Sequence, residues 1–293
     1  MSTFKLSIIV INYNTKELTL NCVSSLYKQY EKELGDGEFE IVLIDNASPD
    51  GSGKELDNLL KDKKGLTFIE SNKNLGFGGG NNKAAEKAKG ELLLFLNSDT
   101  EILDKGLVNM VDFLSKNEKI GVLGARLENI DGTNQRSAVK FYNLPNLFLM
   151  LLGFERLGFL RKSPANISKV DWVSGASLMI RRNLFEKLNG FDKNLFMYAE
   201  DMELCFRVQK ENYDVFFYPN IKIVHKELGS SNKAFAILNI YKGIKYFYKI
   251  HKSKRQYSFA SFLLKVKAFM AIFFGIVSLD KGLIKTYGQA IKI

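Results

Sequence analysis

The first 125 residues alternate short apolar runs with amphipathic stretches, and this alternation constrains the fold more than any other feature of the chain. The apolar runs predict buried strands at residues 6–12, 39–45, 66–69, 91–97 and 121–125. The stretches between them predict helices at residues 15–28, 53–63, 79–89 and 104–116. Strands that are apolar throughout and separated by helices form mostly parallel sheets covered on both faces. The sequence therefore predicts an α/β fold.

Polar residues follow these strands where each one ends. Asn12 closes the first strand, Asp45 closes the second, and Asn97-Ser98-Asp99 closes the fourth, while residues 71–74 follow the third. Ligands of open α/β sheets bind beyond the carboxyl ends of the strands. We therefore expect these residues to share one site.

The remainder of the chain predicts a second set of elements. Residues 141–160 are apolar without a clear period, which indicates a loop with a short helix that touches an acceptor or a membrane. The pattern then predicts a turn and strand at 170–181, helices at 182–188 and 200–211, and strands at 214–218 and 221–225. From Asn232 onward the apolar spacing predicts two amphipathic helices.

None of the polar motifs is specific by itself. Asp45 can accept hydrogen bonds from a base or a ribose, but Asp is also a common turn and cap residue. The glycine-rich residues 74–82 let a backbone approach phosphate and open a helix whose N-terminus favours anions. They match neither the dinucleotide-binding fingerprint nor a P-loop. The carboxylate of Asp99 could bind a hard cation such as Mg²⁺. The alternative is that Asp99 is only part of a turn that Asn97 forms.

The motifs become specific when they are read together and in order. The chain resembles the family 2 glycosyltransferases of the GT-A fold, and within them the bacterial rhamnosyltransferase-like members. The matching segments are residues 7–14, 44–52, 74–82, 94–99, 172–176 with Arg181-Arg182, 190–192, 200–207, and His225 with Gly229-Ser230. The resemblance implies a Rossmann-like GT-A catalytic domain at residues 1–231, followed by a helical extension at residues 232–293.

The resemblance implies a site for a nucleotide-diphosphate sugar. Asn12 and Asp45 match positions that hold the ribose and the base of the nucleotide. The other implied donor-site residues are Asn74, Gly76, Asn97 and Ser98. The implied donor is a pyrimidine nucleotide sugar, with dTDP-rhamnose as the first expectation and a UDP-sugar as the second.

The same resemblance implies a divalent cation, Mg²⁺ or Mn²⁺, beside the diphosphate. Asn97-Ser98-Asp99 matches the D-x-D element of the family, with Asp99 as the retained metal ligand. Asn at the first position removes one negative charge. His225 matches a histidine that completes the metal or diphosphate site in some members, and a structural role for His225 is the alternative.

Asp201 matches the catalytic base of the family. An acceptor hydroxyl is a poor nucleophile, so a carboxylate takes its proton during attack on the anomeric carbon. One such displacement inverts the anomeric configuration. The alternative is that Glu200 and Asp201 only cap the following helix. The resemblance places Trp172, Gly175 and Glu200 on the acceptor side, although Trp172 could instead be a core residue.

The net charge of +10 is concentrated in the C-terminal tail. Residues 233–293 contain 12 of the 42 Lys and Arg residues and one acid, Asp280. This distribution argues against nucleic acid as a partner and indicates an anionic membrane surface. The longest uncharged run, residues 268–279, is shorter than the ~20 residues of a spanning helix. We therefore expect residues 232–293 to form basic amphipathic helices at the interface, or to pack on the catalytic domain or a partner chain.

The sequence thus predicts an inverting, metal-dependent glycosyltransferase at the cytoplasmic face of the cell membrane. It would transfer a sugar to a glycan or a lipid-linked glycan during cell-envelope polysaccharide synthesis. Two isolated cysteines and an N-terminus without signal-peptide features agree with a reducing compartment.

Two alternatives belong to other functional classes. A nucleotidyltransferase would carry a basic, glycine-rich loop after the first strand, where this chain has Asn12-Tyr13-Asn14-Thr15. A non-catalytic membrane-binding module could keep the same fold. The sequence does not indicate an oligomeric state.

Overall fold

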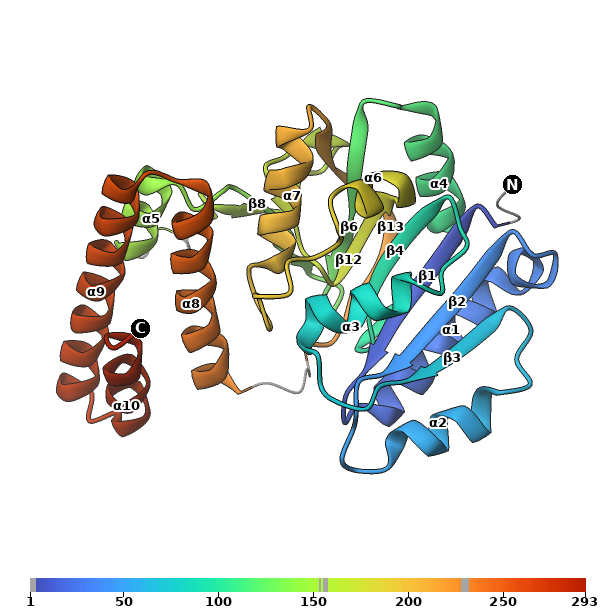
Figure 1. Ribbon diagram of the computed structural model, residues 1–293, viewed down its shortest axis with the longest axis horizontal. Helices are drawn as coiled ribbons and strands as arrows, with labels where there is room; N and C mark the ends of the chain where they lie inside the picture. The colour runs from blue at the N-terminus through green and yellow to red at the C-terminus, as the bar shows by residue number, and fades with distance from the viewer. Residues whose placement is uncertain (1–3, 153, 155–157, 228–231) are drawn as a thin grey trace.

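The computed structural model describes residues 4–152, 154, 158–227 and 232–293. Within these residues a ten-stranded sheet has the order β10-β13-β6-β12-β4-β1-β2-β3, with β5 paired to β13 and β7 paired to β6. The predicted α/β fold with a mostly parallel sheet is confirmed (Figure 1). Gly229 and Ser230, which belong to one of the matching segments, lie outside the described residues.

Four parallel strands from the first third of the chain form one half of the sheet. They are β1 (Leu6–Asn12), β2 (Phe39–Asp45), β3 (Leu66–Glu70) and β4 (Leu92–Asn97). The register sets Asn12 opposite Asp45, and Ile11 opposite Asn97. The polar residues that end these strands therefore meet at one edge, as the sequence predicts.

The other half of the sheet is mixed. Strand β12 (Ser177–Arg181) lies antiparallel between β4 and β6 (Ile120–Glu128), and β13 (Asp214–His225) runs parallel to β6. The short strands β5 (Thr100–Ile102), β7 (Asn134–Gln135) and β10 (Ser168–Lys169) complete it.

Strand β13 is a single strand of 12 residues where the sequence predicts two. The predicted break surrounds Pro219, which has no N–H group to donate to a neighbouring strand. A register shift between Tyr218 and Ile223 absorbs this irregularity, and the strand continues to His225. Pairing with β5 then sets His225 opposite Thr100, which follows Asp99.

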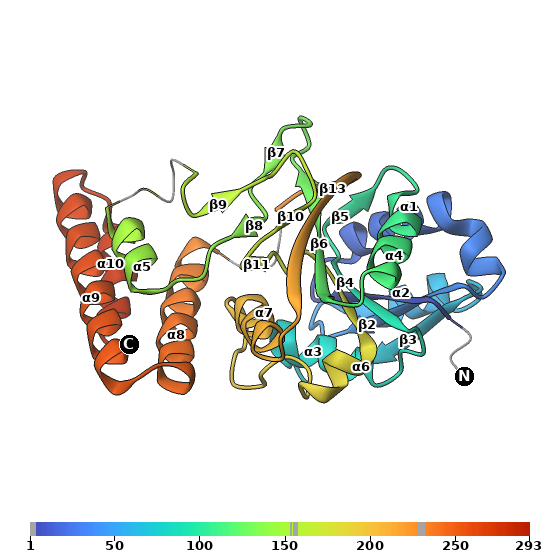
Figure 2. The same cartoon turned by 90° about the horizontal axis from the view of Figure 1, so that it is seen from above.

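Helices cover both faces of the sheet, and each face has its own core (Figures 1 and 2). One face carries α1 (Lys16–Gly35), α2 (Ser52–Leu60) and α4 (Gly106–Lys116), and the other carries α3 (Gly76–Ala85), α6 (Arg182–Lys187) and α7 (Glu200–Lys210). Neighbouring residues of β1 divide between the two cores. Ile8 joins Cys22 of α1, whereas Ile9 joins Met202 of α7.

A smaller three-stranded sheet lies beside the large one. It consists of β11 (Trp172–Val173), β8 (Ala138–Val139) and β9 (Arg161–Lys162). Between β8 and β9 the chain forms α5 (Leu144–Leu151), the short helix predicted within residues 141–160. The Asn143 side chain caps this helix by accepting a hydrogen bond from Asn146 N, and Pro145 occupies its first turn.

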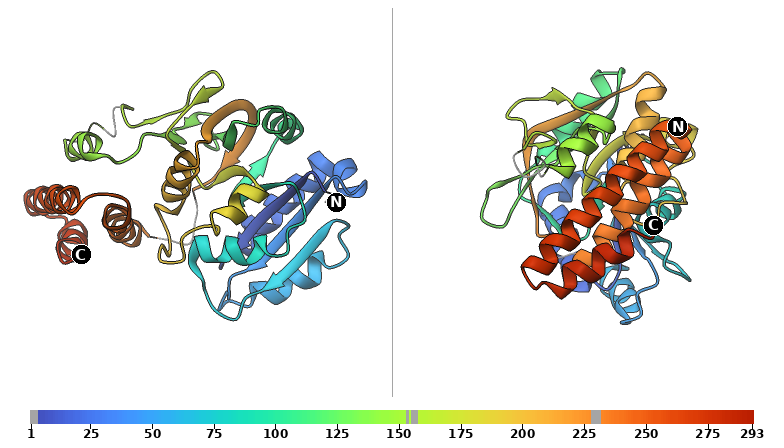
Figure 3. Two further views of the ribbon diagram at one scale, coloured as in Figure 1. Left: turned by 45° about the horizontal axis from the view of Figure 1, so that its top comes forward. Right: turned by 90° about the vertical axis from the view of Figure 1, so that its left-hand side faces the viewer.

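The C-terminal tail forms three helices, whereas the sequence predicts two. They are α8 (Lys233–His251), α9 (Lys254–Val277) and α10 (Lys281–Ala290), and they stand beside the α/β domain as one group (Figure 3). The chain turns back at Leu279, whose φ is +58°, and Asp280 caps α10 by accepting from Leu283 N. A Cβ at Gly275 would lie 2.9 Å from Ile284, so glycine lets α10 pack closely on α9.

Helix α8 shares the core of the catalytic domain. Its buried side chains Ile244, Phe247 and Tyr248 belong to the same cluster as Met202 of α7. His251 Nε2 also lies 2.9 Å from Glu203 Oε1 of α7. Helix α8 therefore packs on the catalytic domain, which is one of the alternatives that the sequence analysis gives for the tail.

Helix α9 is mostly apolar, and its apolar side chains are partly buried and partly exposed. Ala260, Leu263 and Leu264 are buried against the other helices, while Phe269 and Phe273 are 60% and 63% exposed. By length and composition alone, α9 is the one helix of the described residues that could cross a membrane. Lys265 and Lys267, which interrupt its apolar sequence, are both contained in this helix.

Candidate active site

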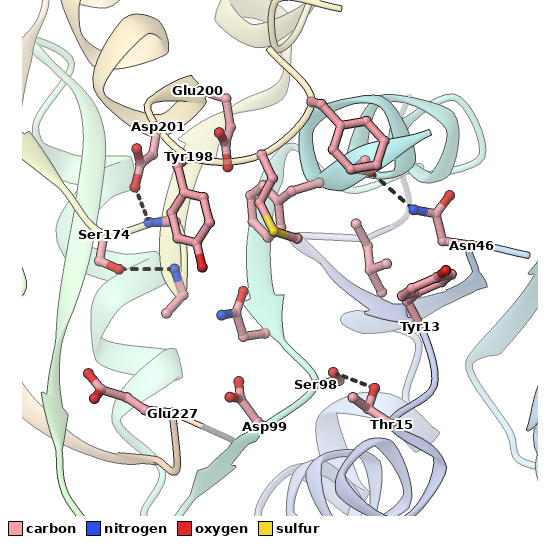
Figure 4. A pocket seen from close by; sticks show the side chains of 18 of the residues that line it. Tyr13, Thr15, Asn46, Ser98, Asp99, Ser174, Tyr198, Glu200, Asp201 and Glu227 are labelled. Atoms are coloured by element: carbon pink, nitrogen blue, oxygen red, sulfur yellow. Dashed lines mark hydrogen bonds between the residues drawn. The ribbon is translucent and has the colours of Figure 1, made fainter. Parts of the chain in front are cut away.

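A cavity of about 720 Å³ opens beyond the carboxyl ends of β1 and β4 (Figure 4). Nine of the predicted site residues line it: Asn74, Gly76, Asn97, Ser98, Asp99, Gly175, Glu200, Asp201 and His225. Three predicted site residues do not line it: Asn12, Asp45 and Trp172. The fold thus gathers residues from both halves of the sheet around one space.

Asn12 and Asp45 form a buried pair behind the cavity. Asn12 Nδ2 donates to Asp45 Oδ1 over 2.6 Å, and Asp45 Oδ2 accepts from Ser48 N over 3.0 Å. A Cβ at Gly53 would lie 2.7 Å from Asp45 Oδ2, so only glycine leaves room for this carboxylate. The pair joins the loops that follow β1 and β2, and its contact with a nucleotide remains a prediction.

The glycine-rich segment begins α3 and is held in place by two asparagines. Asn46 Nδ2 donates to Asn74 Oδ1 and to Gly76 O, each over 3.1 Å, and Asn74 Oδ1 accepts from Gly76 N over 2.9 Å. Gly76 has a φ of +71°, and a Cβ there would lie 2.0 Å from Phe196 O. Glycine is therefore required at position 76, where the start of α3 meets the loop before α7.

The predicted metal-binding residues lie together at the end of β4. His225 Nε2 is 3.3 Å from Asp99 Oδ1 and 3.4 Å from Asn97 Nδ2. Gln135, which the sequence analysis does not include, orients the imidazole. Its Nε2 donates to Asn129 Oδ1 over 2.8 Å and to His225 O over 2.7 Å, which leaves Gln135 Oε1 to accept from His225 Nδ1 over 2.8 Å.

This arrangement fits a divalent cation. With Nδ1 donating to Gln135, the Nε2 lone pair of His225 points toward the Asp99 carboxylate, and two acceptors that face each other suit a cation between them. The described residues contain no group of three or more His, Cys, Asp or Glu side chains that could hold a metal ion. A cation bound by Asp99 and His225 would therefore need further ligands, such as diphosphate oxygens.

The two acidic residues at the start of α7 follow a strained turn. Tyr198 and Ala199 have φ values of +69° and +72°, a region that non-glycine residues rarely adopt. The Asp201 carboxylate accepts from Gly175 N over 2.9 Å and from Met202 N over 2.8 Å. The Glu200 side chain points into the cavity (Figure 4), and its Oε2 atom has no hydrogen-bond partner among the described residues.

These surroundings distinguish the two carboxyl groups. Burial raises the pKa of Asp201, but the hydrogen bonds from Gly175 N and Met202 N and the charge of Arg161 oppose this shift. Burial raises the pKa of Glu200 well above its usual range, and the nearby Asp201 charge raises it further. Asp201 is therefore the member of the pair that ionises more readily, and Glu200 holds a proton more strongly.

Trp172 is a core residue, which was the alternative to its expected acceptor-side position. The residue is 6% exposed, and its Nε1 donates to Lys140 O over 3.1 Å. Its ring meets the Tyr142 ring edge-on, with centroids 6.2 Å apart. Trp172 thus supports the strand that leads to Gly175, and Gly175 N contacts Asp201 directly.

Several cavity residues were missed by the sequence analysis. The aromatic residues among them are Tyr13, Phe77, Phe196, Tyr198 and Phe235. Tyr13 follows Asn12 at a strand end, so its position was a usable signal. Phe235 comes from α8, which the sequence analysis assigned to a separate extension, so no local pattern could place it in the catalytic cavity.

Comparisons with known proteins identify the family of the chain. The family model described as Glycosyl transferase family 2 matches residues 7–188. The chain belongs to glycosyltransferase family 2. A second model, Glycosyl transferase family group 2, matches residues 143–280 and so includes most of the tail. The predicted membership in this family is confirmed.

Curated relatives of this family 2 glycosyltransferase cover different shares of its length. O-antigen biosynthesis protein RfbC of Myxococcus xanthus is 29% identical over 245 residues, which is 80% of this chain but only 18% of RfbC. Rhamnosyltransferase WbbL of Escherichia coli is 26% identical over 69% of this chain and 81% of WbbL. The N-acetylglucosaminyl-diphospho-decaprenol L-rhamnosyltransferase of Mycobacterium tuberculosis is 23% identical over 66% of this chain and 68% of its own length.

Solved glycosyltransferase structures share the GT-A fold with this chain. The mannosyltransferase PcManGT from Pyrobaculum calidifontis, in complex with GDP-Man and Mn²⁺, superposes with a TM-score of 0.60 at 17% identity, over 98% of this chain and 84% of PcManGT. GalNAc-T7 with UDP, GalNAc and Mn²⁺ gives a TM-score of 0.66 at 18% identity, over 97% of this chain and 55% of GalNAc-T7. At these identities the likeness establishes the fold.

Proposed function

We propose that this enzyme transfers a sugar from a nucleotide-diphosphate donor to a carbohydrate acceptor, with inversion at the anomeric carbon. One observation carries the proposal: Asp201 and the Asp99–His225 pair line the same cavity from different elements, and Figure 4 shows Asp201 and Asp99 around that cavity. A base for the acceptor hydroxyl and a cation site for the donor diphosphate therefore lie in the same cavity. This shared cavity also argues against a non-catalytic module.

The donor side of the cavity is formed by the ends of β1, β2 and β4. The Tyr13 ring and the polar backbone of Asn74 and Gly76 can contact the nucleotide. Asp99 and His225 would hold the cation. A divalent cation, when bound there, neutralises the charge that develops on the leaving diphosphate. Two protein ligands suffice because Mg²⁺ and Mn²⁺ complete their coordination with phosphate oxygens and water.

On the acceptor side, Asp201 acts as the general base. Its carboxylate oxygens are fixed by two backbone N–H groups, so the side chain is held ready to accept a proton from the attacking hydroxyl. The hydroxyl attacks the anomeric carbon, the bond to the diphosphate breaks, and the configuration inverts. Glu200, which keeps its proton more strongly, can donate a hydrogen bond to the acceptor.

The relatives support a role in cell-envelope polysaccharide synthesis. Their names describe O-antigen biosynthesis and rhamnose transfer, in one case to a diphosphate-linked lipid sugar. We therefore favour dTDP-rhamnose as the donor, with a UDP-sugar as the second choice, and a lipid-linked glycan as the acceptor. The alternative of a nucleotidyltransferase has no support from the family models.

The exposed apolar face of α9 supports a location on the inner face of the cell membrane. Phe262, Phe269 and Phe273 are each more than half exposed, and Lys265 and Lys267 occur between them in the sequence. Apolar side chains with interspersed lysines suit an interface with anionic lipid. The enzyme would then meet a lipid-linked acceptor at the membrane surface.

Incubation with a panel of nucleotide sugars and Mn²⁺ tests the proposal. We expect slow release of nucleoside diphosphate from one donor, and loss of this release when EDTA is added. The panel contains dTDP-rhamnose, UDP-sugars and GDP-mannose. If no nucleoside diphosphate is released from any of them, the proposed activity is contradicted.

A further inference from the structure

A stripe of lysines on α8 lines a cavity that is open to solvent, where Lys242 and Lys249 are exposed and Lys245 is half-buried. Lys242, Lys245 and Lys249 recur at intervals of three and four residues, so they lie on one side of the helix. The sequence analysis expects the basic tail that contains them to lie at an anionic membrane surface or to pack on the catalytic domain or a partner chain. In the structure all three line a second cavity, of about 370 Å³.

This second cavity adjoins the catalytic one. Phe196 and Met197 line both, so the loop before α7 forms the wall between them. Tyr246 holds this loop to α8, because its hydroxyl donates to Asp192 Oδ2 over 2.8 Å and accepts from Asn194 Nδ2 over 2.8 Å. The wall between the cavities is therefore anchored to the helix that carries the lysines.

The chemistry of the second cavity suits an anion. Its described lining contains three lysines, two tyrosines and two asparagines and no acidic side chain. Lys245 Nζ donates to a main-chain oxygen of Ile293. Three like charges spaced along one helix face repel each other, and a bound polyanion would relieve that repulsion.

A third cavity is also lined by basic residues, but it is less suited to bind an acceptor substrate for the catalytic cavity. It has a volume of about 680 Å³, and Arg136, Lys140, Arg161, Lys162 and Lys169 line it together with Asp171. Its Lys169 is already paired with Asp214 over 2.6 Å. It shares no lining residue with the catalytic cavity.

We infer that Lys242, Lys245 and Lys249 bind the diphosphate of a lipid-linked acceptor while its sugar reaches past Phe196 and Met197 to Asp201. The inference rests on the proposed function, because it assumes such an acceptor. Tyr257 of α9 also lines the second cavity, and α9 carries the exposed apolar face. A lipid chain attached to the diphosphate would therefore leave the cavity beside an apolar surface.

Calorimetric titration with farnesyl diphosphate tests the site in the full chain, with EDTA present to prevent metal-dependent binding at the donor site. We expect binding that weakens at higher salt, and no binding of farnesol, which has no phosphate. Exchanging Lys242→Gln or Lys249→Gln should weaken the binding about fivefold each, the effect of losing one partly exposed charge pair. Lys61→Gln, which alters an exposed lysine directly after α2, is the matched control and should change nothing.

Three results would overturn the inference. The first is absence of farnesyl diphosphate binding by the unaltered protein. The second is loss of binding on Lys140→Gln or Lys162→Gln but not on Lys242→Gln, which would move the site to the larger basic cavity. The third is equal, lysine-dependent binding of dihexanoyl phosphatidylglycerol, which would assign the pocket to membrane headgroups. Release of nucleoside diphosphate from a donor is independent of these titrations, so failure of the pocket and failure of the proposed activity remain distinguishable.

Discussion

Exchange of Glu200 for Gln should stabilise the protein at neutral pH while preserving most of its activity. Glu200 is 5% exposed, its Oε2 has no partner among the described residues, and the Asp201 charge is adjacent. The folded state therefore binds the Glu200 proton more tightly than the unfolded state does. Gln has the shape of the protonated acid but cannot ionise.

The size and pH dependence of this effect follow from the direction of the pKa shift. A carboxyl group whose pKa is raised by folding contributes its full stability below its unfolded pKa and loses it as the pH rises through the folded value. Each tenfold increase in proton affinity corresponds to about 1.4 kcal/mol. We expect Glu200→Gln to raise the free energy of unfolding by about 1–3 kcal/mol near pH 8, with the gain disappearing near pH ~4.

Thermal unfolding at a series of pH values measures this gain, with Glu118→Gln, an exposed glutamate, as the matched control. The control should change the unfolding free energy by less than ~0.5 kcal/mol at every pH. Transfer or donor hydrolysis by Glu200→Gln should stay within about tenfold of the unaltered enzyme. Destabilisation near neutral pH, or a loss of activity as large as that of Asp201→Asn, would show that Glu200 is the ionised partner and refute the assignment.

Three further predictions concern the cation, the strained turn and the apolar face. Asp99→Ala and EDTA should each weaken calorimetric binding of the nucleoside diphosphate, and equal affinity in all cases would remove the metal from the mechanism. A Cβ at Gly243 of α8 would lie 2.7 Å from Ala199 Cβ, so Gly243→Val should displace the turn before Asp201. We expect this displacement to lower kcat by about 10²-fold without weakening donor binding. An unchanged kcat would contradict the view that α8 holds this turn in place. Sedimentation with anionic vesicles should decrease when Phe269 and Phe273 are both changed to Ser, and unchanged sedimentation would locate any membrane contact elsewhere.

The sequence predicted the parallel half of the sheet well, together with the gathering of polar strand ends at one edge, because both depend on local patterns. The strands up to Asn97 are apolar runs that end in polar motifs, and their parallel arrangement gathers those motifs at one edge. The start of α7 was also predictable, since Glu200 and Asp201 occur in a motif with Glu203 and Arg207.

The contacts that depend on long-range packing were not predictable in this way. Gln135 comes from a short strand, and it reaches His225 only because β7 pairs with β6 beside β13. The cavity beside the α8 lysines was not predictable either, because helical spacing shows which residues share a face but not what that face meets. Trp172 could not be placed on the acceptor side or in the core until its partners Tyr142 and Lys140 were known.

In the proposed mechanism Asp201 takes the proton from the attacking hydroxyl, and a comparison of Asp201→Asn with the unaltered enzyme is a direct test of this role. Asn keeps the size of the side chain but cannot accept that proton. With the donor that the unaltered enzyme uses, Asp201→Asn should bind the nucleotide sugar with nearly the same affinity and release nucleoside diphosphate at least ~10²-fold more slowly. Near-normal turnover by this variant would contradict the account and reduce Asp201 to a residue that caps α7.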